Sequence, residues 1–128
     1  MREVRKERSG WRDSALSARH RQWGWDCPAI DIDFLMIEYD RGKASAIVEY
    51  KNEHAAPQFI NHPSYRALID LGNKAGLPVF ACRYSSDFTN WRVTPLNNFA
   101  VEFCPKQTTM TESEWVALLY RTRRAGRV

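Results

Sequence analysis

The stretch "IDIDFLMIEYDRGKASAIVEYK", residues 30–51, constrains the fold more than any other part of the chain. It contains two mainly apolar runs of strand length, separated by the turn sequence "DRGK". Gly42 stands where a three-residue hairpin loop needs a residue with positive φ. We therefore predict two antiparallel strands, over about residues 29–39 and 44–51, joined by the loop "DRG".

A loop of this length fixes which side chains of the hairpin face each other. Asp33 then lies opposite Glu49, and Asp31 lies opposite Lys51. Because side chains alternate between the faces of a sheet, all four charged groups share one face. The other face is expected to belong to the core and carries Ile32, Phe34, Met36, Val48 and Tyr50.

The two opposed carboxylates are suited to binding a cation. Directly opposed residues have Cβ atoms about 5 Å apart, so Asp33 and Glu49 can reach a common ion. Without a cation between them the two charges repel, and one pKa should rise. Lys51 supplies part of the positive charge, and Mg²⁺, which prefers oxygen ligands and keeps several waters, would supply more. A salt-bridged strand pair without any ligand is the alternative, and the excess of acids over lysine on this face favours the metal site.

Periodicity and capping residues predict the remaining elements. A first helix is expected over about residues 11–22, a second in "SYRALIDLGNKAGLP", and a third in "TESEWVALLYRTRR". The second helix should have Pro63 near its first turn and Gly76 at its end, and the third opens with a capping box from Thr111 to Glu114. The stretches "PVFACRYS" and "WRVTPLN" are predicted strands. This order predicts an α/β fold with a mixed central sheet flanked by helices.

The length of 128 residues fits a single domain, which we expect to span 1–128 with basic, flexible ends at about 1–8 and 124–128. No apolar run approaches the roughly 20 residues that a membrane span requires, and no apolar signal region follows the basic start. We therefore expect a cytoplasmic protein without a membrane partner. The three cysteines lack paired spacing and are predicted to be small buried residues.

Charge is distributed unevenly along the chain. Residues 1–25 hold seven Lys or Arg against three acids, residues 26–116 hold eight against twelve, and residues 117–128 hold four Arg and no acid. An acidic centre between basic ends suits a protein that holds a cation centrally and a polyanion around it. Charged, solvated chain ends are the alternative interpretation.

The arrangement of acids and lysine on the hairpin, followed by a helix and another strand, resembles the PD-(D/E)XK nuclease superfamily. This superfamily includes restriction enzymes, Holliday-junction resolvases and phage recombination nucleases. The resemblance rests on Asp33 and on "EYK", residues 49–51, and covers about residues 11–95. The first aspartate of the family usually follows a proline directly, whereas two residues separate Pro28 from Asp31 here. Asp31 is therefore a rival to Asp33, and the predicted register favours Asp33.

The resemblance implies a restriction-endonuclease-like core whose hairpin carries the active site. Asp33 and Glu49 would bind Mg²⁺, for which Mn²⁺ could substitute, with the backbone carbonyl of Tyr50 as a further ligand. Lys51 would orient or polarise the attacking water and stabilise charge on the transition state. The implied activity is a metal-dependent DNA endonuclease of a phage or mobile element, acting on branched or site-specific DNA. Symmetric cutting of a duplex would require a homodimer.

Other residues are accessory candidates, each with a simpler alternative as a surface or loop residue. Glu7 could reach the metal through water, Gln58 lies near the site in sequence, and His54 could face phosphate or transfer a proton. Trp23 and Trp25 could stack on unpaired bases or belong to the core. The arginines expected to bind the DNA backbone are Arg12, Arg19, Arg21, Arg121, Arg123 and Arg124.

Two other functions fit the same residues. A nucleic-acid-binding module could keep this fold without hydrolysing DNA, because a fold does not guarantee a function. A protein-interaction partner inside a larger complex would show neither metal binding nor DNA binding.

Overall fold

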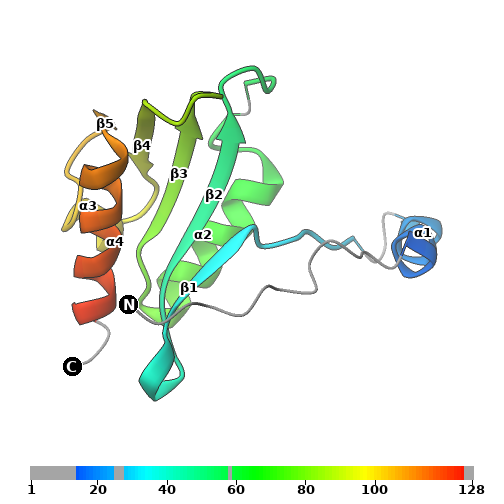
Figure 1. Cartoon of the computed structure of the whole chain (residues 1–128). Coiled ribbons are helices and arrows are strands. Elements are labelled where there is room, and N and C mark those ends of the chain that lie inside the picture. Colours follow the sequence, from blue (N-terminus) through cyan, green and yellow to red (C-terminus); the bar gives the residue numbers. More distant parts are fainter. Residues whose placement is uncertain (1–13, 25–27, 58, 126–128) are drawn as a thin grey trace. The chain divides into compact units, whose positions relative to one another are not determined.

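A computed structural model of the chain describes residues 14–24, 28–57 and 59–125 (Figure 1). The chain divides into two compact units, Met1–Asp31 and Ile32–Val128. The first unit contains helix α1 (Ser14–Gln22), which lies within the predicted range and buries none of its residues. Trp23, next to this helix, is half exposed and contacts the ring of His20, so its interpretation as a core residue is wrong. Trp25 lies outside the described residues.

The second unit is built on a five-stranded mixed sheet in the order β1-β2-β3-β4-β5. Strands β2 and β3 are parallel, and the other neighbours are antiparallel. Helix α2 (Pro63–Ala75) provides the crossover that a parallel pair needs. The predicted α/β class with a mixed sheet flanked by helices is therefore confirmed. The strands are β1 (Phe34–Glu38), β2 (Lys43–Asn52), β3 (Val79–Tyr84), β4 (Trp91–Pro95) and β5 (Thr108–Met110).

The two faces of the sheet are covered by different helices, as Figure 1 shows. On one face, Leu68 of α2 packs against Ile47 and Val79. On the other face, Trp115 and Leu118 of α4 (Glu112–Ala125) pack into the larger cluster, which includes Ala46, Val48, Phe80, Cys82 and Val93. The alternation of side chains along β2 therefore sends its odd-numbered residues toward α2 and its even-numbered residues toward α4.

Helix α2 has the caps that the sequence predicts. Pro63 occupies its first turn, and Gly76 ends it with φ at 72°. Gly72 faces the sheet, where an added Cβ would overlap the side chain of Val79. The absence of a side chain at Gly72 thus allows the helix to lie close to β3.

Helix α4 begins with the predicted capping box. The backbone N–H of Thr111 donates to Glu114 Oε1 at 2.9 Å, and the N–H of Glu114 donates to Thr111 Oγ1 at 3.2 Å. Two short elements before it have no counterpart in the prediction, helix α3 (Asn98–Val101) and strand β5. Each spans only three or four residues, which is too short for periodicity to indicate them.

The hairpin has the predicted register but a different turn. Phe34 pairs with Val48 and Met36 with Ala46, which is the alignment that directs Asp33 toward Glu49. The predicted three-residue loop is wrong, because Glu38 pairs with Lys43 and a 3₁₀ turn, η2 (Tyr39–Arg41), precedes Gly42. The carboxylate of Glu38 accepts the N–H of Arg41 at 2.7 Å and stabilises this turn. A bulge after Met36 restores the register.

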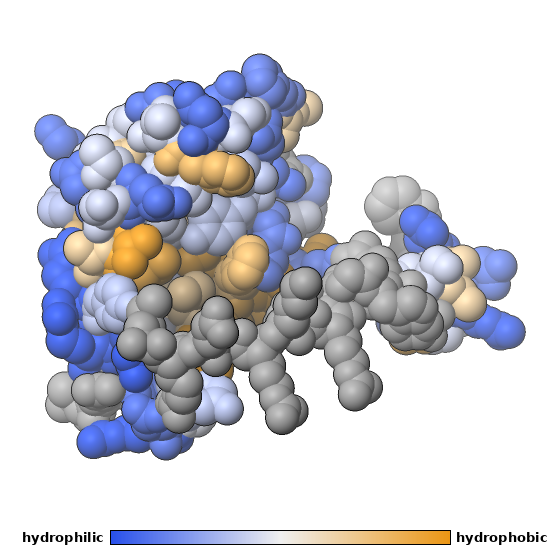
Figure 2. Space-filling model, viewed as in Figure 1, coloured by the Kyte–Doolittle hydropathy of each residue, from blue (hydrophilic) through white to orange (hydrophobic). Residues whose placement is uncertain are grey.

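Strand β1 is shorter than the predicted strand and lies at the edge of the sheet. Met36, Val48 and Tyr50 belong to the core or pack against it, as predicted. Ile32 and Phe34 do not, since 41% and 54% of their surfaces are exposed. An edge strand has a neighbour on one side only, which leaves these side chains partly uncovered. Figure 2 shows apolar side chains at the surface on this side of the unit.

Two predictions about the whole chain can be compared with the described residues. Cys82 and Cys104 are buried as expected, and burial raises the pKa of the Cys82 thiol to about 12. Cys27 lies outside the described part. No helix among the residues described is long and apolar enough to cross a bilayer.

Candidate active site

The candidate catalytic residues come together at the end of the hairpin. Glu49 and Lys51 are odd-numbered residues of β2 and face α2, while Asp33 directly precedes β1. The carboxylate of Asp33 accepts the backbone N–H of Tyr50 at 3.1 Å. A side-chain oxygen therefore binds the backbone of β2 just beyond the last pair of the β1–β2 ladder, which holds Asp33 next to Glu49.

Glu49 carries a perturbed carboxylate. Its side chain is only 14% exposed, and its pKa is raised, first by burial and then by the charge of Asp33. Lys51 opposes this shift, with its Nζ 3.6 Å from Glu49 Oε1. The other oxygen, Oε2, is buried and has no hydrogen-bond partner among the described residues. Buried polar atoms are nearly always satisfied, so this oxygen marks a position where a ligand is expected.

The donor set consists of oxygen atoms and is compatible with Mg²⁺ and with other metals that prefer oxygen ligands. No group of three or more His, Cys, Asp or Glu that could hold a metal occurs in the described ranges. The site offers the carboxylates of Asp33 and Glu49 and the predicted carbonyl of Tyr50, all of them oxygen donors. Mg²⁺ is commonly held by one or two carboxylates and completes its octahedral shell with water and substrate phosphate. The residues present therefore fit this ion.

A cavity of about 340 Å³ opens beside Glu49 and Lys51 on the α2 side of the sheet. Tyr65 lines it and is buried; its pKa is raised by burial and then by the charge of Glu49. Arg92 and Gln107 contribute from β4 and from the segment before β5. Volumes of this order are typical of small-molecule sites, so the cavity can admit part of a substrate next to the carboxylates.

Tyr50 connects the site to the opposite face of the sheet. Its ring lies among Phe34, Tyr84, Trp91 and Trp115, at centroid distances from 5.2 to 6.3 Å. The indole N–H of Trp115 donates to the Tyr50 hydroxyl at 3.0 Å, and burial raises the pKa of Tyr50 to about 12. The residue between Glu49 and Lys51 is thus fixed by the core beneath α4.

Sequence reasoning missed several residues of the cavity. Tyr65 was predicted only as part of the apolar face of α2, and no role was predicted for Phe59, Arg92 or Gln107. The alternation of side chains along β3 and β4 could have indicated that Arg92 lies on the same face of the sheet as Lys51. Register places Lys51 beside Arg83 and Arg83 beside Arg92, so the three cations form one row across neighbouring strands.

The accessory candidates are only partly described by the structure. Glu7 and Gln58 lie outside the described residues. His54 is exposed beyond the end of β2, with its Nε2 3.1 Å from Glu53 Oε1, and does not belong to the described lining of the cavity. Asp31 belongs to the first unit, so its pairing with Lys51 stays a prediction; the ion pair of Lys51 with Glu49 lies within β2.

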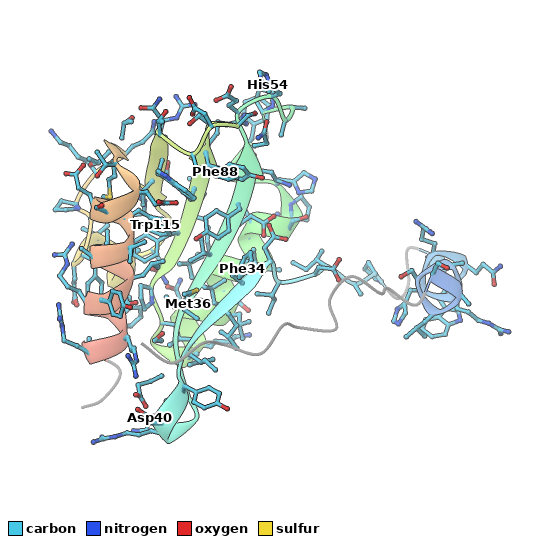
Figure 3. The ribbon with its side chains drawn as sticks, viewed as in Figure 1. Phe34, Met36, Asp40, His54, Phe88 and Trp115 are labelled. Carbon is cyan, nitrogen blue, oxygen red and sulfur yellow. The ribbon has the colours of Figure 1, made fainter. Side chains whose placement is uncertain are left out.

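The arginines expected to bind DNA have other surroundings. Arg123 pairs with the buried Glu38 at 3.3 Å and with Asp40 at 3.5 Å, and Arg121 donates to the carbonyl of Phe103 at 3.4 Å. Asp40 and His54 mark opposite ends of the sheet in Figure 3, so Arg123 lies at the end remote from Glu49. Arg124 is exposed in the last turn of α4. Arg19 and Arg21 lie on α1 in the first unit, and Arg12 lies outside the described part.

Comparison of the chain with protein-family models, with curated proteins and with solved structures found no match. The function is therefore inferred from the site itself.

Proposed function

We propose that the protein is a Mg²⁺-dependent phosphodiesterase that cleaves DNA, with an active site of the PD-(D/E)XK kind on a restriction-endonuclease-like core. Asp33, Glu49 and Lys51 are its catalytic residues. The proposal combines the resemblance in the sequence with the geometry at the end of β2.

One observation carries the proposal: Glu49 Oε2 is buried beside a second carboxylate and has no hydrogen-bond partner in the part of the chain that the structure describes. A carboxylate in such a place is costly unless a cation neutralises it. Lys51 Nζ lies 3.6 Å from the other oxygen of Glu49, Oε1. An ion pair with Lys51 accounts for Oε1 but not for the burial of Oε2 next to the charge of Asp33.

The roles of the side chains follow from their positions. Asp33 and Glu49 would hold Mg²⁺ together with the carbonyl of Tyr50; when bound, this ion lowers the pKa of a coordinated water and acts as a Lewis acid on phosphate. The ammonium of Lys51, 3.6 Å from Glu49, stabilises negative charge on a non-bridging phosphate oxygen as water adds and the bond to the leaving oxygen breaks. The surrounding cavity orients the strand that is cut.

The described residues of each chain contain one such site, which would cut one strand at a time. Cleavage of both strands of a duplex at one position would therefore need two copies related by a two-fold axis. The proposed active form on duplex DNA is a homodimer.

Cleavage of supercoiled plasmid and of a four-way junction, with Mg²⁺ or with EDTA, tests the proposal. Glu49→Ala and Lys51→Ala should each reduce the metal-dependent rate by at least about 100-fold, the loss typical of removing one transition-state contact. Lys51→Ala should still bind DNA. Lys43→Ala is the matched control, because this lysine is exposed at the other end of β2, and it should cut normally.

Two results would contradict the proposed activity. Cleavage that persists in EDTA would exclude the metal-dependent mechanism, and wild-type rates in both site variants would exclude the residues. Binding without any cleavage by the wild-type protein would favour the non-catalytic module instead.

A further inference from the structure

The cavity beside Glu49 continues into a second hollow along the same face of the sheet. The second hollow has a volume of about 530 Å³, and Arg83 and Arg92 line both. Its other polar residues come from the loop that follows β2, the end of β3, the β3–β4 connection and β5, and they are Glu53, Tyr84, Ser85, Asn90 and Thr109. Lys51, Arg83 and Arg92 form a row through the two hollows, which we call the cationic groove.

The two arginines of the cationic groove differ in their hydrogen bonding. The guanidinium of Arg83 already binds the backbone, since its Nη1 donates to the carbonyls of Asn52, Glu53 and Ala55 at 3.0 to 3.2 Å. It thereby holds the loop that follows β2. Arg92 is exposed, and neither a hydrogen bond nor an ion pair engages its side chain within the described part of the chain. An uncommitted guanidinium at the junction of two hollows is suited to bind a phosphate.

The rim of the first cavity is apolar rather than charged. Phe59 and Ile60, from the loop between β2 and α2, line it while 80% and 54% of their surfaces are exposed. Phe59 is the most exposed of the large apolar residues described. A bare aromatic ring beside a cationic path is the combination by which proteins bind single strands, since bases stack on rings and the backbone follows the positive charge.

We propose that the cationic groove binds an unpaired DNA strand, with a base stacked on Phe59 and a phosphate on Arg92. This inference rests on the proposed nuclease function and names its substrate class, single-stranded or locally unpaired DNA. A base inside a duplex already stacks on its neighbours, so its face is not available to a protein ring. Lys51 and Arg92 lie two strands apart, about 10 Å, so the groove follows the backbone away from the cleaved bond.

Binding measured in EDTA tests this inference without requiring hydrolysis. Anisotropy of a labelled single-stranded oligonucleotide and of the matching duplex should show tighter binding of the single strand. Phe59→Ala should weaken single-strand binding by between about 5- and 150-fold, the effect of losing one stacked base, and Phe59→Trp should restore it. Tyr39→Ala is the matched control, an exposed aromatic residue in the hairpin turn, and it should have no effect.

The salt dependence of the same binding tests Arg92. Arg92→Gln should reduce the slope of log K against log salt by about 0.7, the value for one phosphate contact on a single strand. Lys43→Gln, at an exposed lysine at the opposite end of β2, should leave the slope unchanged. Preference for the duplex, full single-strand affinity in Phe59→Ala, or an unchanged slope in Arg92→Gln would each overturn the inference.

The binding and cleavage experiments test the two proposals separately, so either proposal can fail while the other holds. Single-strand binding that depends on Phe59 and Arg92, without cleavage in Mg²⁺, would keep this inference and reject the nuclease activity. Cleavage that depends on Glu49 and Lys51 but tolerates Phe59→Ala and Arg92→Gln would do the reverse.

Discussion

Mg²⁺ should stabilise the folded protein through Glu49, and the effect can be worked out from the geometry of the site. The pKa of Glu49 is raised above its ordinary value of 4.5, so the folded state holds its proton to higher pH than the unfolded state does. Stability without metal should therefore fall as pH rises from about 4.5 through the folded pKa, and the penalty should remain above it. A cation bound between Asp33 and Glu49 removes this penalty.

The expected size follows from mass action. A site with few protein ligands binds Mg²⁺ weakly, with a Kd on the order of 1 mM. At about 10 mM Mg²⁺ such a site adds RT ln 11, about 1.4 kcal/mol, to the free energy of unfolding. For a unit of roughly 100 residues this corresponds to an increase in Tm of about 6 to 11 °C. At pH near 4.5 the increase should shrink, since protonated Glu49 is a poor ligand.

Differential scanning fluorimetry of the wild-type protein, Glu49→Gln and Glu53→Gln, with and without Mg²⁺, measures the effect. Glu49→Gln should lose the Mg²⁺-dependent increase in Tm and remain at least as stable as the wild type without metal, because the repulsion with Asp33 is gone. Glu53→Gln should keep the increase, since Glu53 pairs with His54 away from the carboxylates. An equal increase in Glu49→Gln, or none in the wild type at saturating Mg²⁺, would refute the reasoning.

Two further predictions concern stability. Gly72→Ala should destabilise the protein by about 1 to 3 kcal/mol, because overlap with Val79 outweighs a gain of at most about 1 kcal/mol in helix propensity; a rise in Tm would contradict this. Arg123→Ala should cost about 1 to 3 kcal/mol by removing an ion pair from the buried carboxylate of Glu38, measured by urea unfolding. The same variant should leave the salt dependence of DNA binding unchanged, and a flatter slope would return Arg123 to the DNA interface.

Local signals in the sequence were sufficient to predict where the main helices begin or end and where the hairpin turns. Pro63 and Gly76 bound α2, the pair Thr111 and Glu114 begins α4, and the position of Gly42 gives the hairpin its approximate turn. These signals work because each satisfies backbone groups within a few residues. The exact turn was not predictable, because it depends on the carboxylate of Glu38, whose burial and pairing with Arg123 are tertiary.

The residues of the site also fall into those that local sequence signals predict and those that only the tertiary structure brings together. Asp33, Glu49 and Lys51 were predicted because they lie on one hairpin, where register alone brings side chains together. Phe59 and Arg92 reach the cavity from a loop and from a strand about forty residues further on, and only the parallel β2–β3 crossover places them there. No spacing in a single sequence reports such a neighbourhood.

The position of Tyr50 has a consequence for how such a site can vary. In the sequence Glu-x-Lys the middle residue points to the opposite face of the sheet from Glu49 and Lys51, and in this fold it is an aromatic side chain surrounded by four other rings. Its backbone N–H meanwhile holds Asp33. Residue 50 therefore meets two structural requirements, because its side chain fills the core and its backbone N–H holds Asp33 next to Glu49. A library that randomises this position while keeping Glu49 and Lys51 would sample protein stability and active-site geometry as one coupled property.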